Sequence, residues 1–304
     1  MNSLQNKCVY VVSPDCQGDL CKELGGETHI EGNLVFSSVD LKEPIFAQDK
    51  WLHPKIEKIE SIGHAAKILR AEKSIWHPNI INCARRSLLI AEKLPLYRNK
   101  PIKFPLLKPL PKIGSYSLLD ENTLIYSVDR WKNIPNGEYH FEEDKINPPS
   151  RAYLKLWEAL TFLGHYPKKG DKALDLGASP GGWTYVLQSL GAEVLAVDRA
   201  KLDDKIAALP GVSMETKSAF SLDPSDFDYF DWFVCDMACY PEKLWVFLRK
   251  WMESGKVGQF ICTLKLQGET DFSVIEKFKS IPSATVIHLF HNKHEVTFLL
   301  GDQR

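Results

Sequence analysis

The sequence lacks long apolar runs. Its start, MNSLQNKCVYVVSPDC, has no basic segment followed by a long apolar stretch, which is the order found in a secretory signal peptide. Elsewhere no apolar run approaches the roughly 18 to 20 residues that a transmembrane helix requires. We therefore expect a soluble, cytoplasmic protein that has no membrane partner.

The sequence also lacks the cysteine pairs of a disulfide framework or a zinc site. Its seven cysteines are odd in number, and no two are spaced as Cys-x-x-Cys. This usage favours reduced thiols, and Cys235 and Cys239 are expected to be small buried side chains. His288, His291 and His294 are spaced by three in a predicted strand and turn, where they would point in different directions, so no metal site is expected.

An excess of charge of either sign is absent as well. The 304 residues carry 38 Lys or Arg and 39 Asp or Glu, which argues against a surface that is basic all over for nucleic acid. One segment departs from this balance, because Arg85 to Lys112 holds eight Lys or Arg against one Glu. Its five prolines exclude one continuous helix.

Two domains are predicted, with a boundary near residue 145 in the polar, proline-rich segment EEDKINPPS. A chain of this length with 44% hydrophobic residues can bury two ordinary cores. Residues 1–145 show a small α+β pattern. The expected elements are a strand at 7–12, a helix that ends at Gly25, a strand at 34–39, helix over 50–94 with an interruption near Trp76, and strands between 113 and 139.

Residues 146–304 alternate regularly between strands and helices. The strand candidates are KALDL, EVLAVD, VSMETK, WFVCD, FICTLKL, TVIHLFH and EVTFLLG. The alternation predicts an α/β fold with a doubly wound, mostly parallel sheet. Only residues 292–294 separate the last two strands, and so short a link forces an antiparallel hairpin. One intervening helix has an apolar stripe, Leu244, Phe247, Leu248 and Trp251, that is expected in the core.

Charged residues stand at the ends of four predicted strands. These residues are Asp175, Asp198, Asp236 and Lys265. Ligands of open α/β sheets bind outside the carboxyl ends of the parallel strands. Because the last strand runs the other way, its first residue, Glu295, should lie at the same edge. We expect these five polar side chains to converge there.

A glycine-rich loop, Gly177 to Trp183, follows the first of these strands. Small residues let backbone N–H groups approach a ligand closely, and Pro180 suits the first turn of the next helix. A tight strand-to-helix turn is the simpler alternative, but Asp198 is placed to accept hydrogen bonds from ribose hydroxyls, which favours a nucleoside ligand. The loop lacks the Gly-x-Gly-x-x-Gly spacing that receives a pyrophosphate, so an NAD-dependent oxidoreductase is disfavoured.

The segments PPSRAYLKLWEAL, DLGASPGGWTYVL, VCDM, CTLKL and HEVTFLL together resemble the FtsJ family of S-adenosylmethionine-dependent RNA ribose 2'-O-methyltransferases. Within it, the likeness is to enzymes that modify a cytidine ribose of large-subunit ribosomal RNA. The resemblance covers residues 145–304. It implies a Rossmann-like methyltransferase domain with a mostly parallel seven-stranded sheet whose last strand is antiparallel, preceded by a smaller α+β accessory domain.

The resemblance implies S-adenosylmethionine as the cofactor and assigns roles to individual residues. Ser218 stands where the family usually has an acid that contacts the adenine. The implied catalytic residues are Lys155, Asp236, Lys265 and Glu295. The implied cofactor-binding residues are Asp175, Gly177, Ala178, Ser179, Pro180, Gly181, Gly182, Trp183, Asp198, Ser218 and Asp236.

Methyl transfer to a hydroxyl requires a base, and Lys265 is the candidate. We expect burial and the neighbouring cation Lys155 to lower its pKa, while Asp236 and Glu295 oppose this effect. The alternative interpretation of Lys155 is a surface ion pair with Glu158 on the same helix.

The predicted function is therefore methylation of a ribose 2'-hydroxyl in RNA, with ribosomal RNA as the expected substrate and partner. Residues 1–145 are expected to recognise the RNA. The basic segment Arg85 to Lys112 is expected either to neutralise phosphates, with Tyr97 and Phe104 stacking on bases, or to be a solvated linker. A catalytically inactive RNA-binding or ribosome-assembly protein with the same fold is the main alternative.

Overall fold

The computed structural model describes residues 8–95, 97 and 99–301 and divides the chain into two compact units. The N-terminal unit comprises Met1–Pro101 and Leu107–His140, and the C-terminal unit comprises Ile102–Leu106 and Phe141–Arg304. The chain thus passes into the second unit at Phe141, close to the predicted boundary. The segment Ile102–Leu106 belongs to the C-terminal unit although the sequence pattern placed it in the first domain.

The described part of the N-terminal unit is an α+β structure with two sheets. The first sheet has the strand order β2-β3-β1-β4-β9, and the second has the order β5-β8-β7-β6. All of their strand pairs are antiparallel except β6 with β7. The elements are β1 (Cys8–Val11), α1 (Gln17–Leu24), β2 (Thr28–Glu31), β3 (Leu34–Ser37), β4 (Asp49–Leu52), β5 (Lys55–Lys58), α2 (Ile62–Ala71), β6 (Ile75–Pro78), α3 (Ala84–Ala91), β7 (Ile113–Asp120), β8 (Thr123–Ser127) and β9 (Asp129–Arg130).

The helical prediction over residues 50–94 is wrong in two places, where the structure has β4 and β5, whereas β6 lies at the predicted interruption near Trp76. The apolar spacing from Ile56 to Ala66 suggested one helix but belongs to two elements, because β5 ends before Ser61. The Ser61 Oγ accepts a hydrogen bond from the His64 N–H at 3.1 Å and caps α2 at its true start.

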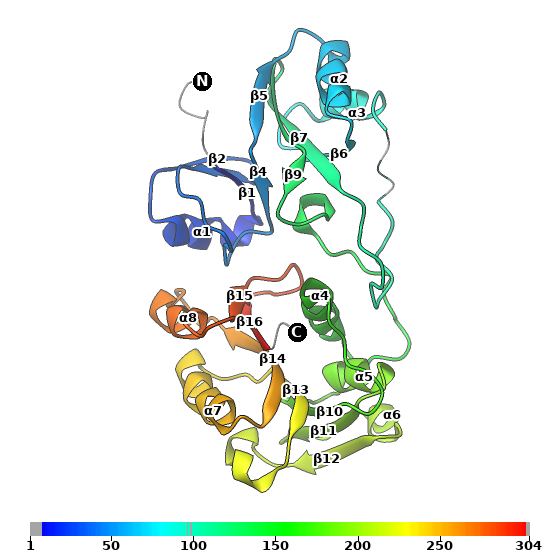
Figure 1. The fold of residues 1–304 in the computed structure, drawn as a ribbon, viewed down its shortest axis with the longest axis vertical. Helices are drawn as coiled ribbons and strands as arrows, with labels where there is room; N and C mark the ends of the chain where they lie inside the picture. Colours follow the sequence, from blue (N-terminus) through cyan, green and yellow to red (C-terminus); the bar gives the residue numbers. More distant parts are fainter. Residues whose placement is uncertain (1–7, 96, 98, 302–304) are drawn as a thin grey trace. The chain divides into compact units, whose positions relative to one another are not determined.

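The C-terminal unit contains a seven-stranded sheet of order β12-β11-β10-β13-β14-β16-β15 (Figure 1). Strands β10 to β14 pair in parallel, and β16 is antiparallel to both of its neighbours. The predicted α/β fold with its reversed last strand is confirmed. The elements are α4 (Tyr153–Leu163), β10 (Lys172–Leu176), α5 (Gly182–Ser189), β11 (Glu193–Asp198), α6 (Asp204–Ala207), β12 (Val212–Thr216), β13 (Phe230–Cys235), α7 (Pro241–Ser254), β14 (Val257–Lys265), α8 (Phe272–Lys279), β15 (Thr285–Ile287) and β16 (Glu295–Gly301).

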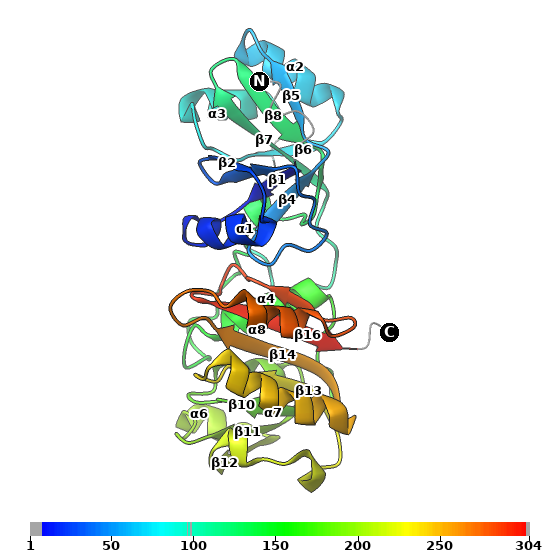
Figure 2. The same cartoon turned by 90° about the vertical axis from the view of Figure 1, so that its left-hand side faces the viewer.

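Helices cover both faces of this sheet. Helices α7 and α8 lie on one face, whereas α4 and α5 lie on the other (Figures 1 and 2). The stripe of α7 packs into the core as predicted, since Leu244, Phe247, Leu248 and Trp251 are all buried. Burial of each such side chain contributes about 1.5 to 3 kcal/mol. Within the described residues, no helix is long and apolar enough to cross a membrane.

The segment Ile102–Leu106 packs against α4 within the C-terminal unit. Ile102 pairs with Phe141 in an isolated parallel bridge. The Phe104 ring stacks on the Trp157 ring with centroids 4.6 Å apart, and the Leu106 N–H donates to the Tyr166 hydroxyl at 3.1 Å. This segment therefore covers the helix that also carries Lys155.

Candidate active site

Four of the five polar residues predicted at the strand ends lie at one edge of the C-terminal sheet, whereas Asp175 is buried within β10 and bonded to Thr184. Strands β11 and β14 end at Asp198 and Lys265, and Asp236 directly follows β13. Strand β16 begins at Glu295, whose Cα partner across the ladder is Lys265. The reversal of β16 is thus what brings Glu295 to the carboxyl ends of the parallel strands.

Two lysines and two carboxylates form a closed ring of ion pairs, which we call the tetrad: Lys155, Asp236, Lys265 and Glu295. The Lys155 Nζ lies 2.6 Å from Asp236 Oδ2 and 3.0 Å from Glu295 Oε1. The Lys265 Nζ contacts the other oxygens, Asp236 Oδ1 and Glu295 Oε2. Between 7% and 22% of each side chain is exposed. The charges alternate around the ring and sum to zero.

The expected depression of the Lys265 pKa is wrong for this arrangement. Burial lowers the pKa of Lys265, but the charges of Asp236 and Glu295 and the hydrogen bonds to both outweigh burial, so its pKa is raised above the ordinary value. Burial correspondingly raises the pKa of Asp236 and of Glu295, and the two lysines outweigh it, leaving both pKa values lowered. In this state of the site Lys265 is a cation.

Two polar residues that the sequence did not indicate hold the carboxylates in place. The Thr263 Oγ1 donates to Asp236 Oδ1 at 2.6 Å, and the Asn292 Nδ2 donates to Glu295 Oε1 at 3.3 Å. Thr263 lies two residues before Lys265 on β14, so the period of a strand places both side chains on one face. That spacing was a usable signal, whereas Asn292 lies in a turn whose conformation no local pattern specifies.

The interpretation of Lys155 and Glu158 as a surface ion pair is wrong. Glu158 is completely buried, and its carboxylate accepts hydrogen bonds from the backbone N–H groups of Phe290 and His291 at 2.7 and 2.9 Å. The His291 Nδ1 lies 2.7 Å from the same carboxylate. Lys155 pairs instead with Asp236 and Glu295 in the tetrad.

The glycine loop brings the backbone of Gly177 close to the backbone of Met237. Gly177 has a φ of 75°, and a Cβ at this position would lie 3.0 Å from the Met237 backbone, a contact that real Cβ atoms scarcely make. The expectation for Pro180 is wrong, because α5 begins at Gly182 and is preceded by Gly181 with a φ of 115°, which no helical turn contains. Pro180 instead accepts the Asp203 N–H through its carbonyl oxygen at 3.0 Å.

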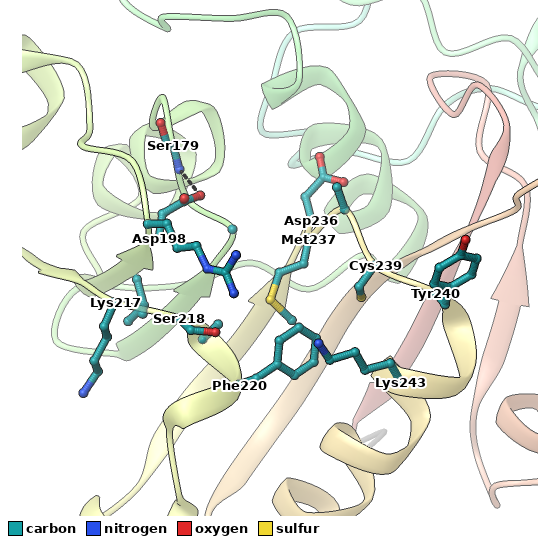
Figure 3. Close-up of a pocket in the computed structure, with 15 residues that line it drawn as sticks. Ser179, Asp198, Lys217, Ser218, Phe220, Asp236, Met237, Cys239, Tyr240 and Lys243 are labelled. Atoms are coloured by element: carbon teal, nitrogen blue, oxygen red, sulfur yellow. Dashed lines mark hydrogen bonds between the residues drawn. The ribbon is translucent and has the colours of Figure 1, made fainter.

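A pocket of about 540 Å³ opens beside the tetrad (Figure 3). Five of the residues predicted to bind a cofactor line it: Gly177, Ser179, Asp198, Ser218 and Asp236. A volume of this size is typical of pockets for small organic ligands. Asp236 lies both in the pocket wall and in the tetrad, so it joins the two parts of the site.

The remaining residues predicted to bind a cofactor are not in the pocket wall. Asp175 is buried and accepts the Thr184 hydroxyl at 2.6 Å, and burial raises its pKa to about 7. Ala178 is buried against Ala196, and the Trp183 Nε1 donates to the Ala152 carbonyl. A Cβ on Gly181 or Gly182 would meet Ile206 or Ser150 respectively. These residues therefore pack the glycine loop against neighbouring elements and do not line the pocket.

Asp198 is fixed by its own loop. Its Oδ2 accepts the Ser179 N–H at 3.1 Å, as Figure 3 shows, and its Oδ1 accepts the Ala200 N–H at 2.9 Å. Each carboxylate oxygen can accept more than one hydrogen bond. The side chain is therefore preorganised and still able to bind a ligand's hydroxyl groups.

The pocket also contains residues that the sequence pattern did not single out. Arg199 follows Asp198, and Lys217 precedes Ser218. Lys243 on α7 places its Nζ 4.1 Å from the centroid of the Phe220 ring (Figure 3). Position next to a strand end could have indicated Arg199. Lys243 lies on the polar face of the amphipathic helix α7, where no local pattern marks it as a pocket residue.

The three neighbouring histidines point apart, as expected. The ring of His288 contacts the Lys293 carbonyl, the ring of His291 contacts Glu158, and the ring of His294 contacts the Gly268 carbonyl. Of the predicted buried thiols, Cys235 is fully buried, whereas Cys239 is only partly covered and lines the pocket.

Comparisons with known proteins place this site in a family. Residues 148–296 match the model of the FtsJ-like methyltransferases. The Ribosomal RNA large subunit methyltransferase M of Halorhodospira halophila is 33% identical over 159 residues, which are 50% of this chain and 46% of that protein. The protein of the same name from Thauera aminoaromatica is 31% identical over 174 residues, 52% of this chain and 47% of that protein. The chain thus spans about half the length of these relatives.

Among solved structures, a Streptococcus thermophilus protein whose name designates it a hemolysin gives a TM-score of 0.42 at 22% identity, covering 56% of this chain and 74% of that chain. So distant a likeness carries no argument about function. The match of residues 148–296, together with the sheet order and the polar residues that meet at the strand ends, identifies a methyltransferase domain in the C-terminal unit. Over these residues, just under half of the chain, the unit is similar to the FtsJ-like methyltransferases.

Proposed function

We propose that the protein transfers a methyl group from S-adenosylmethionine to a ribose 2'-hydroxyl of RNA, with ribosomal RNA as the substrate, in the cytoplasm. The observation that carries this proposal is the tetrad, in which Lys155, Asp236, Lys265 and Glu295 meet at the edge of a pocket within a methyltransferase domain. The names of the similar curated proteins support ribosomal RNA as the substrate.

The residues around the pocket fit a charged nucleoside such as S-adenosylmethionine. The Asp198 carboxylate suits ribose hydroxyls, and Ser218 and Phe220 offer a hydroxyl and an aromatic ring to the base. Asp236 offers a carboxylate toward a cation. The bare backbone at Gly177 leaves room where a side chain would close the pocket against Met237.

When bound, S-adenosylmethionine would supply the electrophilic methyl group. The tetrad then has to hold the attacking hydroxyl and accept its proton, and positioning alone can provide a large part of the rate. We assign the base to Lys265, the more exposed lysine, and an electrostatic and orienting role to Lys155. A lysine can act as a base only after it has lost its own proton.

The charge balance of the tetrad supplies a route to that state. Lys265 keeps its proton because two carboxylates face it. A further positive charge placed beside Asp236 competes with Lys265 for that carboxylate. This competition lowers the pKa of Lys265. Since Asp236 also lines the pocket, the pocket's occupant can control the protonation of Lys265.

We propose that the N-terminal unit recognises the RNA. The basic segment Arg85 to Lys112 belongs to this unit except for Ile102–Leu106, and it supplies cations for phosphates. Arg98 of this segment lies outside the described residues. Salt-dependent contacts of these cations would position the RNA strand. Within this segment, the Phe104 ring is stacked on Trp157, so it is a packing residue and is withdrawn as a platform for bases. The Tyr97 ring lies edge-on to the His77 ring, with centroids 6.4 Å apart, and its faces keep the proposed stacking role.

The alternatives are not favoured. An inactive RNA-binding protein would not need a tetrad in which every charge is paired, and an oxidoreductase that binds NAD would need the glycine spacing that this loop lacks. The direct test is incubation of the purified protein and labelled S-adenosylmethionine with ribosomal RNA from cells that lack the protein. Label in that RNA, and none in RNA from normal cells, supports the proposal; label in neither refutes it.

A further inference from the structure

The buried carboxylate of Glu158 links two parts of the active site that lie far apart in sequence. Glu158 lies on α4, three residues after Lys155, and is 0% exposed. Its partners are the backbone N–H groups of Phe290 and His291 and the His291 ring. Burial of a carboxylate is costly unless hydrogen bonds satisfy it, so these contacts fix the turn between β15 and β16 on the helix.

The same turn presents Glu295 to the lysines. Asn292 closes the turn, because its Oδ1 accepts the Leu289 N–H at 2.8 Å and the Thr297 hydroxyl at 3.0 Å. Its Nδ2 donates to Glu295 Oε1 at 3.3 Å. That oxygen is also the partner of the Lys155 Nζ, at 3.0 Å. A continuous chain of contacts therefore runs from Glu158 through the turn to Glu295.

We propose that Glu158 is a positioning residue for methyl transfer. It holds the turn that carries Glu295 in register with the helix that carries Lys155, so that one carboxylate can face both lysines. This inference rests on the proposed function. The hydrogen-bond partners of Glu158, Phe290 and His291, do not belong to the pocket wall, and Glu158 acts through Glu295. A shift of about 1 Å in the turn would break the hydrogen bond between Glu295 and Lys155.

The test uses Glu158→Gln in the full-length chain. The amide keeps the shape but turns one acceptor into a donor that faces the N–H groups of the turn. We expect a cofactor dissociation constant within about twofold of the parent and a single-turnover rate lowered about 10- to 100-fold, because the loss falls on positioning. The methyl-transfer rate rises with pH as Lys265 loses its proton, and in Glu158→Gln this rise should begin at a lower pH than in the parent. The reason is that a displaced Glu295 no longer helps to raise the pKa of Lys265.

A double-mutant cycle separates positioning from a general loss of structure. Glu158→Gln should cost little further rate in a Glu295→Gln background, because the residue through which it acts is already altered. Equal fold losses in both backgrounds, or an unshifted pH profile, would overturn the inference. Glu253→Gln is the matched control, because Glu253 pairs with Arg249 on the surface of α7, and its rate should equal the parent's.

Two further outcomes keep the inference distinct from the proposed function. If the parent itself transfers no methyl group, the proposed function fails; if the parent is active and Glu158→Gln equals it, only the positioning role fails.

Should Glu158→Gln not fold, His291→Ala removes the ring contact with Glu158, together with the ring contacts with Phe141 and Phe290, and leaves both backbone contacts of Glu158 in place. We then expect a three- to tenfold lower rate that disappears in the Glu295→Gln background, and a loss that persists there contradicts the inference.

Discussion

Lys265, the last residue of β14, and Glu295, the first residue of β16, face each other across the ladder between these two strands. Their side chains form an ion pair. The pairing depends on the reversed direction of β16, because a parallel strand would have placed its first residue at the opposite edge of the sheet. The topology of the fold thus assembles a base and its counter-charge from residues 30 positions apart.

The first prediction compares the two lysines. Lys265→Arg preserves the positive charge but removes a group that can lose its proton, since arginine keeps its proton at any working pH. We expect single-turnover methyl transfer to fall about 100- to 10,000-fold with cofactor binding retained. Lys155→Arg should be milder, because a permanent cation can still orient Asp236 and Glu295. A near-parent rate for Lys265→Arg, or greater damage from Lys155→Arg, contradicts the assignment.

The second prediction concerns proton release on cofactor binding. S-adenosylmethionine carries a sulfonium cation and S-adenosylhomocysteine carries a neutral sulfur. A cation beside Asp236 should lower the pKa of Lys265, so only the former should release protons, and its affinity advantage should grow as pH rises. Calorimetry in two buffers of different ionisation enthalpy measures the release. Equal proton release for both ligands, or undiminished release in Lys265→Arg, speaks against the proposed control of Lys265.

The third prediction concerns stability against pH. Asp236 and Glu295 have pKa values lowered by folding, so their contribution is present above the unfolded pKa, near 4, and is lost as pH falls through the folded values. Lys265 has a raised pKa, so its contribution is present below about 10.5 and is lost as pH rises through the folded value. Between these limits Glu295→Gln should destabilise the protein by about 3 kcal/mol.

Urea denaturation at neutral and at acidic pH measures that difference. The free energies of unfolding of the parent and of Glu295→Gln should converge as pH falls through the folded-state pKa of Glu295. A difference that is the same at both pH values would mean that Gln disturbs packing rather than the charge balance.

The fourth prediction is that Asp198 binds the cofactor ribose. Asp198→Ala should weaken S-adenosylmethionine binding by about 1.5 to 3 kcal/mol, the range for a charged hydrogen-bond partner. Asp198→Asn retains an oxygen for the Ser179 N–H and serves as the control for loop order. An unchanged dissociation constant in Asp198→Ala by calorimetry removes the residue from the site.

The fifth prediction concerns where the chain can be cut between its two units. A fragment that starts near Asp144 would have a complete sheet but would lose Phe104 and Phe141, whose rings contact Trp157. We expect it to be less stable than the full chain and to lose most RNA affinity and its salt dependence. Adding a peptide of residues 101–107 to a fragment starting at Phe141 should raise the melting temperature. The segment is dispensable if the peptide leaves the melting temperature of the fragment unchanged and Phe104→Ala also leaves that of the full chain unchanged.

The sequence predicted the C-terminal sheet well because each element carried its own signal. Strands such as KALDL and the stripe on α7 are local patterns, and a three-residue link decides the hairpin. Asp236, Lys265 and Glu295 meet in the structure because strand topology brings their ends to one edge of the sheet. Lys155 lies on α4, and only the resemblance to the FtsJ family indicated it. The proposed chemical roles of these residues stay predictions.

What the sequence could not supply were interactions between distant segments. Glu158 looked like a helix-surface partner of Lys155 because local spacing says nothing about a turn more than a hundred residues away. The pKa of Lys265 was misjudged because the outcome depends on how closely Asp236 and Glu295 approach it. Phe104 looked like an exposed ring in a basic segment, and only the stack on Trp157 shows that it packs.

The central claim is methyl transfer to a ribose hydroxyl, and alkaline hydrolysis of the labelled RNA tests it most directly. A 2'-O-methyl group blocks cleavage of the adjacent phosphodiester bond, whereas a methyl group on a base does not. After reaction of ribosomal RNA from cells that lack the protein, we predict that the label resides in one alkali-resistant dinucleotide, and that Lys265→Arg leaves this product nearly absent. Label recovered only in alkali-labile mononucleotides would contradict the account.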